Sequence, residues 1–217
     1  MTWAGVILAA GTGERMKSRT AKPLHRVCGV PMLTHAVRAA VGARLDPIVT
    51  VVQPAHSEQH DIREAAGPSL LAVQDQQLGT AHATEAARSA IGGATSVFIF
   101  YADAPLIRPE TIATIIESHE AAEAVLTVAT VVDPPVSGFG RVTRDRDGQA
   151  TGIVEKIDAD EETLPIRERN TGWYAVQAEW LWDALPRIDA TNGERYLTDL
   201  VALAVGEQKP ISTVRVS

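Results

Sequence analysis

The sequence has little cysteine and no excess of basic charge. Cys28 is the only cysteine among 217 residues, which excludes an internal disulfide framework and favours a reducing compartment, so we expect a cytoplasmic protein. Acidic residues outnumber basic ones by 27 to 20, giving a net charge of −7. This balance argues against nucleic acid as a partner, because phosphate contacts need a basic face. Nor does any apolar run reach the ~18 residues of a membrane-spanning helix, so we expect no membrane association.

The overall composition, with 45% hydrophobic and 22% charged residues, is typical of an ordinary globular protein. A chain of this length buries roughly 70% of its unfolded surface, so it needs no disulfide or structural metal. At roughly 150 residues per domain, we expect one domain over residues 1–217.

Short β-branched segments alternate with longer helical patterns. The segments are apolar on both faces, as buried parallel strands are. We expect strands at 6–8, 48–52, 70–73, 97–100 and 124–128, and helices at 31–43, 57–66, 81–91 and 109–122. This alternation predicts right-handed βαβ units in an α/β, Rossmann-like, doubly wound sheet with helices on both faces.

Beyond about residue 130 the rhythm changes. The polar stretch 142–151 contains Asp-Gly turn chemistry and predicts a hairpin. Further strands are expected at 152–154, 173–176 and 211–216, with a helix at 198–205, so the predicted sheet is mixed. Trp180 and Trp182 are two apart on a predicted helix and cannot share a face. We therefore expect one of them to be exposed or at a contact, and a homo-oligomer stays open.

A loop of small residues follows the first predicted strand. Residues 8–16 read Leu-Ala-Ala-Gly-Thr-Gly-Glu-Arg-Met, and such a backbone can approach a ligand closely. In doubly wound sheets nucleotides bind here, outside the carboxyl ends of the strands. A dinucleotide fingerprint needs a glycine where Met16 stands, and a P-loop needs Gly-Lys-Ser/Thr, so neither is present. Arg15 and Lys22 instead add two cations, which favours a phosphate site over a simple tight turn.

Together with Lys22-Pro23, this run resembles the signature of the sugar-nucleotide pyrophosphorylases, nucleotidyltransferases with a Rossmann-like core. Later segments resemble, in order and spacing, the bacterial N-acetylglucosamine-1-phosphate uridylyltransferases, in the N-terminal pyrophosphorylase domain of the bifunctional enzyme. These segments are 74–83, 101–106, 138–141, 153–155 and 169–172. The resemblance extends from Trp3 to about Val216, and residues 77–83 are its most specific part.

The resemblance implies a nucleotide site in the first part of the chain. Gln74 and Gln77 would read uracil through their amides, since an amide offers both donors and acceptors to a pyrimidine edge. His82 is expected to pack or form hydrogen bonds, because no partner for base catalysis is evident. The implied nucleotide-binding residues are Leu8, Ala9, Ala10, Gly11, Gln74, Gln77, Gly79 and Thr80, the last two beginning a helix.

The resemblance also implies that Asp103 holds Mg²⁺ and that Arg15, Lys22 and Asp103 are the catalytic residues. Mg²⁺ prefers one or two carboxylates together with phosphate oxygens and water. From the residues alone, the alternative is that Asp103 is a helix N-cap or a turn residue before Pro105.

A sugar-binding portion is implied at about residues 130–200. Gly172 would allow close approach near the N-acetyl group. The alternative for Glu155 is an ordinary surface pair with Lys156. The implied sugar-binding residues are Tyr101, Gly140, Glu155 and Asn170.

The implied reaction joins UTP and N-acetylglucosamine 1-phosphate into UDP-N-acetylglucosamine, a cell-wall peptidoglycan precursor, and releases pyrophosphate. The attacking phosphate has a second pKa near ~6 and is already ionised at neutral pH, so no general base is needed. Another sugar 1-phosphate or another base is the alternative within this enzyme class.

Some positions depart from the resemblance. Ala21 stands where proline is usual, Glu14 where a small polar residue is common, and Ala102 where glycine is usual. The family's second magnesium ligand, an asparagine, and the left-handed β-helix acetyltransferase domain lie beyond Ser217. We therefore expect this chain to bind UTP, to transfer uridylyl groups weakly and to transfer no acetyl groups. A weakly catalytic sugar-nucleotide-binding module is the alternative in another function class.

Overall fold

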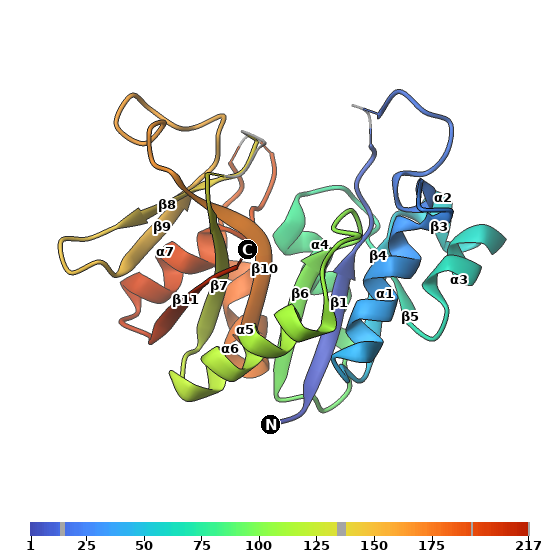
Figure 1. Ribbon diagram of the computed structural model, residues 1–217, viewed down its shortest axis with the longest axis horizontal. Coiled ribbons are helices and arrows are strands. Elements are labelled where there is room, and N and C mark those ends of the chain that lie inside the picture. The colour runs from blue at the N-terminus through green and yellow to red at the C-terminus, as the bar shows by residue number, and fades with distance from the viewer. Residues whose placement is uncertain (14–15, 134–137, 192, 217) are drawn as a thin grey trace.

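The computed structural model describes residues 1–13, 16–133, 138–191 and 193–216. A mixed sheet forms its centre (Figure 1), and within these residues seven strands follow the order β11-β7-β10-β6-β1-β4-β5. The hairpin of β8 and β9 joins the sheet through β10. The strands are β1 Trp3–Leu8, β4 Ile48–Val52, β5 Leu70–Val73, β6 Ser96–Tyr101, β7 Leu126–Val132, β8 Arg141–Arg144, β9 Ala150–Val154, β10 Glu168–Gln177 and β11 Ile211–Arg215.

The strands β5, β4, β1 and β6 form the parallel half of the sheet. β1 pairs in parallel with both β4 and β6, and β4 pairs with β5. All five residues of β4 are buried, as the apolar pattern predicts for a central parallel strand. Because every strand here runs in one direction, their carboxyl ends meet at a single edge.

The strands β7 to β11 form the mixed half. β10 runs antiparallel to β6 and β7, while β11 is parallel to β7. The register of β10 against β7 shifts between Asn170 and Tyr174, which marks a bulge in β10. β8 and β9 form the antiparallel hairpin that the Asp-Gly turn predicts.

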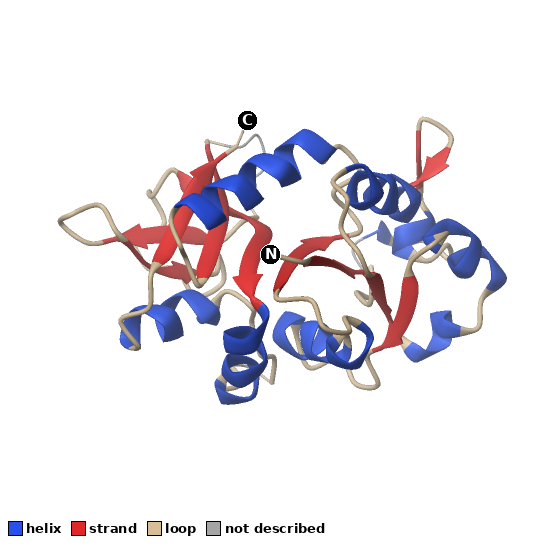
Figure 2. Cartoon of the chain, turned by 90° about the horizontal axis from the view of Figure 1, so that it is seen from below, coloured by secondary structure: helices blue, strands red, loops and turns tan. Residues whose placement is uncertain are grey.

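Helices cover both faces of the sheet (Figure 2). Leu33, Ile62 and Ile112 belong to the core on one face, and Ala81 and Leu200 to the core on the other. The first face carries α1 Met32–Gly42, α3 His60–Ala66 and α5 Pro109–Ala121, and the second carries α4 Thr80–Ala86, α6 Ala178–Ala184 and α7 Asp199–Gly206. The predicted Rossmann-like, doubly wound mixed sheet is therefore confirmed.

Short elements complete the described chain. They are the helices η2 Lys22–Leu24, α2 Pro54–Ser57, η3 Arg88–Ala90 and η4 Leu185–Arg187, and the strands β2 Arg26–Val27 and β3 Val30–Pro31. Among the described helices, none is long and apolar enough to cross a membrane.

Several predicted elements differ from those observed; the strand expected at 173–176, for example, is part of β10 Glu168–Gln177. The helix expected at 57–66 is split into α2, which starts at Pro54, and α3. The helix expected at 81–91 ends at Ala86 and continues as the short helix η3. The strand expected at 124–128 starts at Leu126 and runs on to Val132. Because proline suits the first turn of a helix, α2 begins at Pro54, three residues before the predicted start at residue 57.

The prediction for the two tryptophans is wrong. Trp180 and Trp182 are 8% and 9% exposed, although they point to different sides of α6. α6 also buries Ala178, Leu181 and Ala184, so the core covers a wide arc of the helix that includes both tryptophans, whereas the face with Glu179 and Asp183 is exposed. The Nε1 of Trp180 donates a hydrogen bond of 2.8 Å to Glu207 Oε2, which satisfies its polar atom.

Candidate functional site

The small-residue loop leaves β1 at the edge where the parallel strands end. Leu8, Ala9 and Ala10 are buried, whereas Gly11 is exposed and has open space beside its Cα. Ala9 N–H donates to Val51 O of β4 at 2.8 Å, and Leu8 O accepts from the amide that follows β6 at 3.0 Å. The loop is thus fixed to both neighbouring strands, at the position where doubly wound sheets bind nucleotides.

Lys22 and Asp103 come together at this edge. Lys22 starts η2, Asp103 follows β6, and Lys22 Nζ forms an ion pair with Asp103 Oδ2. A Cβ on Gly13 would lie 2.9 Å from Lys22 Cβ, so the glycine lets the loop pack against the lysine stem. The two side chains are 34% and 40% exposed, which leaves the pair accessible to a ligand. Arg15 lies outside the described residues.

Gln74 and Gln77 both use their amide nitrogens within the protein. Gln74 Nε2 donates to Gly79 O at 3.0 Å and contacts His82 Nδ1 at 3.2 Å. Gln77 Nε2 donates to Ala10 O at 3.0 Å and to Gln53 Oε1 at 3.1 Å. These contacts take up the two hydrogens of each amide, so each glutamine keeps only its carbonyl oxygen for a ligand. The expected hydrogen-bonding role of His82 is confirmed.

Gly79 and Thr80 begin α4, as expected, and a distant segment holds them there. Gly79 has φ of +93°, and a Cβ on it would lie 2.4 Å from Arg195 O. Ala81 N–H donates to Arg195 O at 3.0 Å, and Leu197 N–H donates to Thr80 Oγ1 at 2.8 Å. Only glycine fits this close approach of two backbones.

Tyr101 connects the nucleotide residues with the implied sugar residues. A Cβ on Gly172, which has φ of +79°, would lie 2.2 Å from Tyr101 Cε2. The tyrosine ring therefore occupies the space that Gly172 leaves, where the resemblance implies the N-acetyl group. Burial raises the pKa of Tyr101, and the charges of Glu155 and Asp103 raise it further, so its hydroxyl stays protonated.

Gly140, Glu155 and Asn170 lie together in the mixed half. Gly140 O accepts from Asn170 N–H at 2.9 Å, and a Cβ on Gly140 would lie 3.5 Å from Glu155 Oε1. Asn170 is buried: its Nδ2 donates to the Tyr174 hydroxyl at 2.6 Å, and its Oδ1 accepts from Gly172 N–H at 2.9 Å. These contacts fix the Asn170 side chain at the bulge of β10.

Glu155 carries a perturbed carboxylate. Burial raises its pKa, and the charges of Asp158 and Asp199 raise it further, whereas Thr198 and Arg141 act in the opposite direction. A carboxylate whose pKa is raised by desolvation strengthens its hydrogen bonds to hydroxyl donors. Glu155 is thus a half-buried acceptor and more than a surface partner of its neighbour in sequence.

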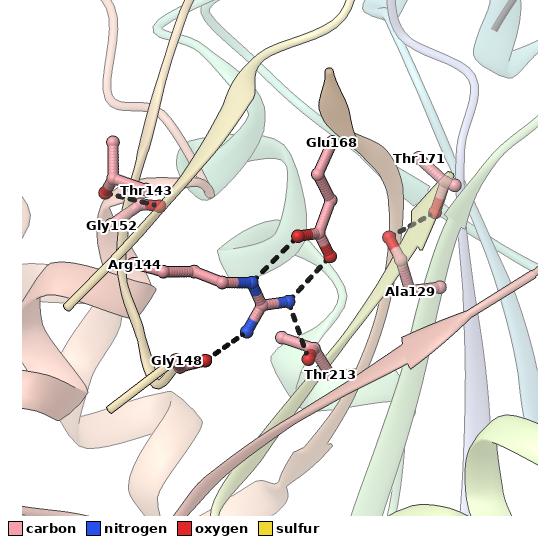
Figure 3. Close-up of polar contacts among 8 residues, drawn as sticks. All are labelled: Ala129, Thr143, Arg144, Gly148, Gly152, Glu168, Thr171 and Thr213. Atoms are coloured by element: carbon pink, nitrogen blue, oxygen red, sulfur yellow. Dashed lines mark hydrogen bonds and ion pairs between the residues drawn. The ribbon is translucent and has the colours of Figure 1, made fainter. Parts of the chain in front are cut away.

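Arg144 fastens the hairpin of the mixed half to the sheet (Figure 3). Its Nε and Nη2 donate to the two oxygens of Glu168 at 2.8 and 2.6 Å. Its Nη2 also reaches Thr213 Oγ1 at 3.0 Å, and its Nη1 reaches Gly148 O at 2.8 Å. One guanidinium thereby links β8, β10, β11 and the hairpin turn, and this bidentate geometry is the strong form of an ion pair.

Sequence reasoning missed Arg195 and Arg144. Arg195 supplies the backbone against which Gly79 packs, and its Nη1 donates to Glu85 Oε2 of α4 at 3.0 Å. Neither arginine lies in a motif, so no local pattern indicates its role. The pairing of Arg144 with Glu168 follows only from the register of β8 and β10.

Comparison with known proteins places the chain among nucleotide-transferring domains. Residues 5–204 match the family described as MobA-like NTP transferase domain. The chain is 42% identical over 211 residues to the bifunctional protein GlmU of Anaeromyxobacter sp. (strain K) and 43% identical over 208 residues to that of Pelotomaculum thermopropionicum. The alignments cover 93% and 94% of this chain but 42% and 45% of the relatives, so the chain spans less than half of their length.

A solved structure shares the fold at low sequence identity. It is the crystal structure of a UDP-glucose pyrophosphorylase complexed with UDP-glucose, with a TM-score of 0.73 and 16% identity. The similarity covers 99% of this chain and 91% of that chain, so it includes both halves of the sheet.

Proposed function

Because the chain belongs to the family of MobA-like NTP transferase domains, we propose that it makes UDP-N-acetylglucosamine and pyrophosphate from UTP and N-acetylglucosamine 1-phosphate. Membership of this family makes it a nucleotidyltransferase. The choice of nucleotide and sugar is the proposal, and it is supported by the motifs at 8–16, 74–83 and 169–172. A cytoplasmic site of reaction is part of the proposal and is supported by the free, exposed Cys28.

The observation that carries the proposal is the convergence of Lys22 and Asp103 beside the loop that follows β1. A triphosphate bound along Gly11 would lie at the carboxyl edge of β1, within reach of these two charges. Lys22 then exchanges its partner from Asp103 to a phosphate and stabilises the charge on the α-phosphate and on the departing pyrophosphate.

The residues present fit a magnesium ion. Asp103 offers a solvent-accessible carboxylate, and the described residues contain no group of three or more His, Cys, Asp or Glu that holds a metal by itself. One carboxylate completed by phosphate oxygens and water is a set that Mg²⁺ accepts. We propose that Asp103 holds Mg²⁺, which supplies positive charge at the phosphates when bound.

The chemistry needs no general base from the chain. A sugar phosphate has its second pKa near ~6, so the attacking oxygen is ionised at neutral pH. The remaining task is to bring one anion to another in line with the leaving group, which is a matter of positioning. Glu155, with Gly140 and Asn170 beside it, would bind the sugar and fix the direction of attack.

Pyrophosphate release tests the proposal. The chain is mixed with UTP, CTP or GTP and with N-acetylglucosamine 1-phosphate or glucose 1-phosphate, in the presence of Mg²⁺. We expect UTP to exceed CTP by about tenfold or more in kcat/KM, because a mismatched buried hydrogen bond costs about 1–3 kcal/mol. CTP or GTP used as well as UTP would contradict the uracil assignment, and a preference for glucose 1-phosphate would contradict the sugar assignment.

A substitution of Lys22 separates the phosphate role from base recognition. Lys22→Met should weaken UTP binding while leaving the affinity for uridine unchanged, because the ammonium acts on the phosphates. Titration calorimetry with both ligands measures this difference. Equal losses for uridine and UTP would show that Lys22 acts elsewhere.

A further inference from the structure

The side chain of Gln74 is buried and its amide orientation is fixed. Gln74 is 4% exposed, and its Nε2 lies 3.0 Å from Gly79 O. A backbone carbonyl oxygen can only accept a hydrogen bond, so the amide nitrogen must occupy this position. The second hydrogen of the same nitrogen points to His82 Nδ1 at 3.2 Å.

His82 lies on the first turns of α4 and acts here as an acceptor. Because Gln74 donates to Nδ1, the neutral ring carries its proton on Nε2. The ring also lines a cavity of ≈ 180 Å³ with Asp75 and Glu85, and Arg195 is paired with that glutamate. The histidine is thus the second anchor of the Gln74 amide, after the backbone at Gly79.

Since both hydrogens of the Gln74 amide are used, its carbonyl oxygen is the one polar atom of the side chain that can still bind a ligand. Among the described residues no donor reaches Gln74 Oε1, so this oxygen remains for a ligand and can only accept. Uracil presents an N–H donor at N3, where cytosine presents an acceptor. An amide locked in this orientation therefore favours uracil over cytosine, which a freely rotating amide does not.

We propose that His82 is a positioning residue for base recognition: by accepting the second amide hydrogen of Gln74, it holds Oε1 as the atom that meets the base. This inference rests on the proposed function, in which the base is uracil. Without an acceptor at the Nδ1 position, only the hydrogen bond to Gly79 O opposes a flip of the Gln74 amide, and the flipped amide presents its Nε2 donor to a cytosine.

Two substitutions of similar shape test the role of the acceptor. His82→Asn places an oxygen where Nδ1 lies, and His82→Leu places a methyl group there. We expect His82→Leu to lower the UTP-to-CTP ratio of kcat/KM by about tenfold, mainly through KM for UTP, whereas His82→Asn stays within about twofold of wild type. Dissociation constants for UTP and CTP should change in parallel, and thermal unfolding checks that both variants are folded.

A spectroscopic measurement on the wild-type protein is independent of any variant. The ¹⁵N spectrum of the imidazole should show an unprotonated Nδ1 that accepts a hydrogen bond and a protonated Nε2. A proton on Nδ1 would overturn the inference, and so would a His82→Leu variant that keeps the wild-type nucleotide ratio. Equal losses in the leucine and asparagine variants would also overturn it.

The outcomes separate this inference from the proposed function. A wild-type protein that binds CTP as tightly as UTP contradicts uracil recognition and the role of His82 together. A wild-type preference for UTP that survives in His82→Leu overturns only the role of His82 and leaves uridylyl transfer intact.

Discussion

The two halves of the sheet hold the polar groups of the candidate site in different ways. In the parallel half, the neutral amides of Gln74 and Gln77 are tied to the backbone oxygens of Gly79 and Ala10. In the mixed half, neutral hydrogen bonds hold Asn170, but the hairpin of β8 and β9 is fastened to the sheet by the partly buried ion pair of Arg144 with Glu168.

Several carboxylates of the mixed half have pKa values shifted from their ordinary ones. Burial raises the pKa of Glu155 and of Asp199, and the hydrogen bonds from Arg144 lower the pKa of Glu168. By contrast, the ion pair of Lys22 and Asp103 in the parallel half is open to solvent. The glutamine amides of the parallel half therefore keep their orientation independently of pH, whereas the carboxylates of the mixed half keep their ion pairs only while they are ionised.

The largest expected effect comes from Asp103 at the phosphate edge. Asp103→Asn should lower kcat/KM for pyrophosphate release by ~10²-fold or more, because a misplaced metal loses transition-state stabilisation. Its thermal stability should stay close to wild type, since exposed ion pairs contribute only about 0–1 kcal/mol. The matched change in the mixed half, Glu155→Gln, should mainly raise KM for the sugar phosphate. Normal turnover of Asp103→Asn at ordinary Mg²⁺ would remove the metal role.

The two crowded glycines test the rigidity of each half. Gly79→Ala should lower the free energy of unfolding by roughly 3 kcal/mol or more, because the new Cβ meets the backbone of Arg195 in a left-handed conformation. Gly172→Ala should lower the free energy of unfolding less, since the new Cβ meets the side chain of Tyr101 and not a backbone, but it should raise KM for the sugar phosphate more. Urea unfolding and steady-state kinetics measure the two effects.

Gly148→Ala is the control for both glycines. Gly148 has φ of +81° but no atom near a Cβ, so it isolates the backbone penalty of about 1–2 kcal/mol. If Gly79→Ala loses no more free energy of unfolding than Gly148→Ala does, the backbone at Arg195 moves aside at little cost.

A pH dependence is expected from His119, on the helix that leads into the mixed half. It is fully buried, its Nδ1 lies 2.9 Å from Thr127 Oγ1, and burial lowers its pKa from 6.5 to about 4. The unfolded chain binds this proton first, so stability is complete above pH 6.5 and declines as the pH falls toward 4. The loss attributable to His119 amounts to roughly 3 kcal/mol across that window.

The variant His119→Gln isolates this contribution, because glutamine does not titrate. Free energies of unfolding at pH 7 and 4.5, measured in urea for both proteins, should decline less steeply in the variant. Parallel declines in the two proteins would show that carboxylates alone cause the acid sensitivity.

The smallest effect is expected from the Arg144 pair. Arg144→Met should cost about 2 kcal/mol of unfolding free energy, because it removes the guanidinium that pairs with both oxygens of the partly buried Glu168 carboxylate. The double variant with Glu168→Met should regain part of this loss, and the double-mutant cycle gives the coupling energy. Because the pKa of Glu168 is lowered in the folded protein, this contribution is present at neutral pH and is lost as the pH falls through that lowered pKa. A coupling energy near zero would show that the bidentate pair does not stabilise the hairpin.

Local patterns in the sequence determined the parallel half and the order of the elements. Apolar runs identified β1, β4 and β6, because a strand buried on both faces carries this composition. The run of β5 is equally apolar, but β5 is an edge strand and Leu70 and Val73 at its ends are exposed. The hairpin of β8 and β9 followed from its Asp-Gly turn, since turn chemistry is set by adjacent residues. The identities of the candidate site residues came from the family resemblance that the motifs carry.

Tertiary structure alone decided how those residues are arranged. The pairing of Lys22 with Asp103, the direction of the Gln74 amide and the Tyr101 ring against Gly172 join residues from different elements. The burial of both Trp180 and Trp182 likewise depends on what covers α6 from each side. Such contacts depend on strand register and helix packing. Both are set by the whole core, so a local sequence pattern does not predict them. The sequence therefore determined which chemical groups the candidate site contains, and the packing of distant segments determined which of their atoms remain free for a ligand.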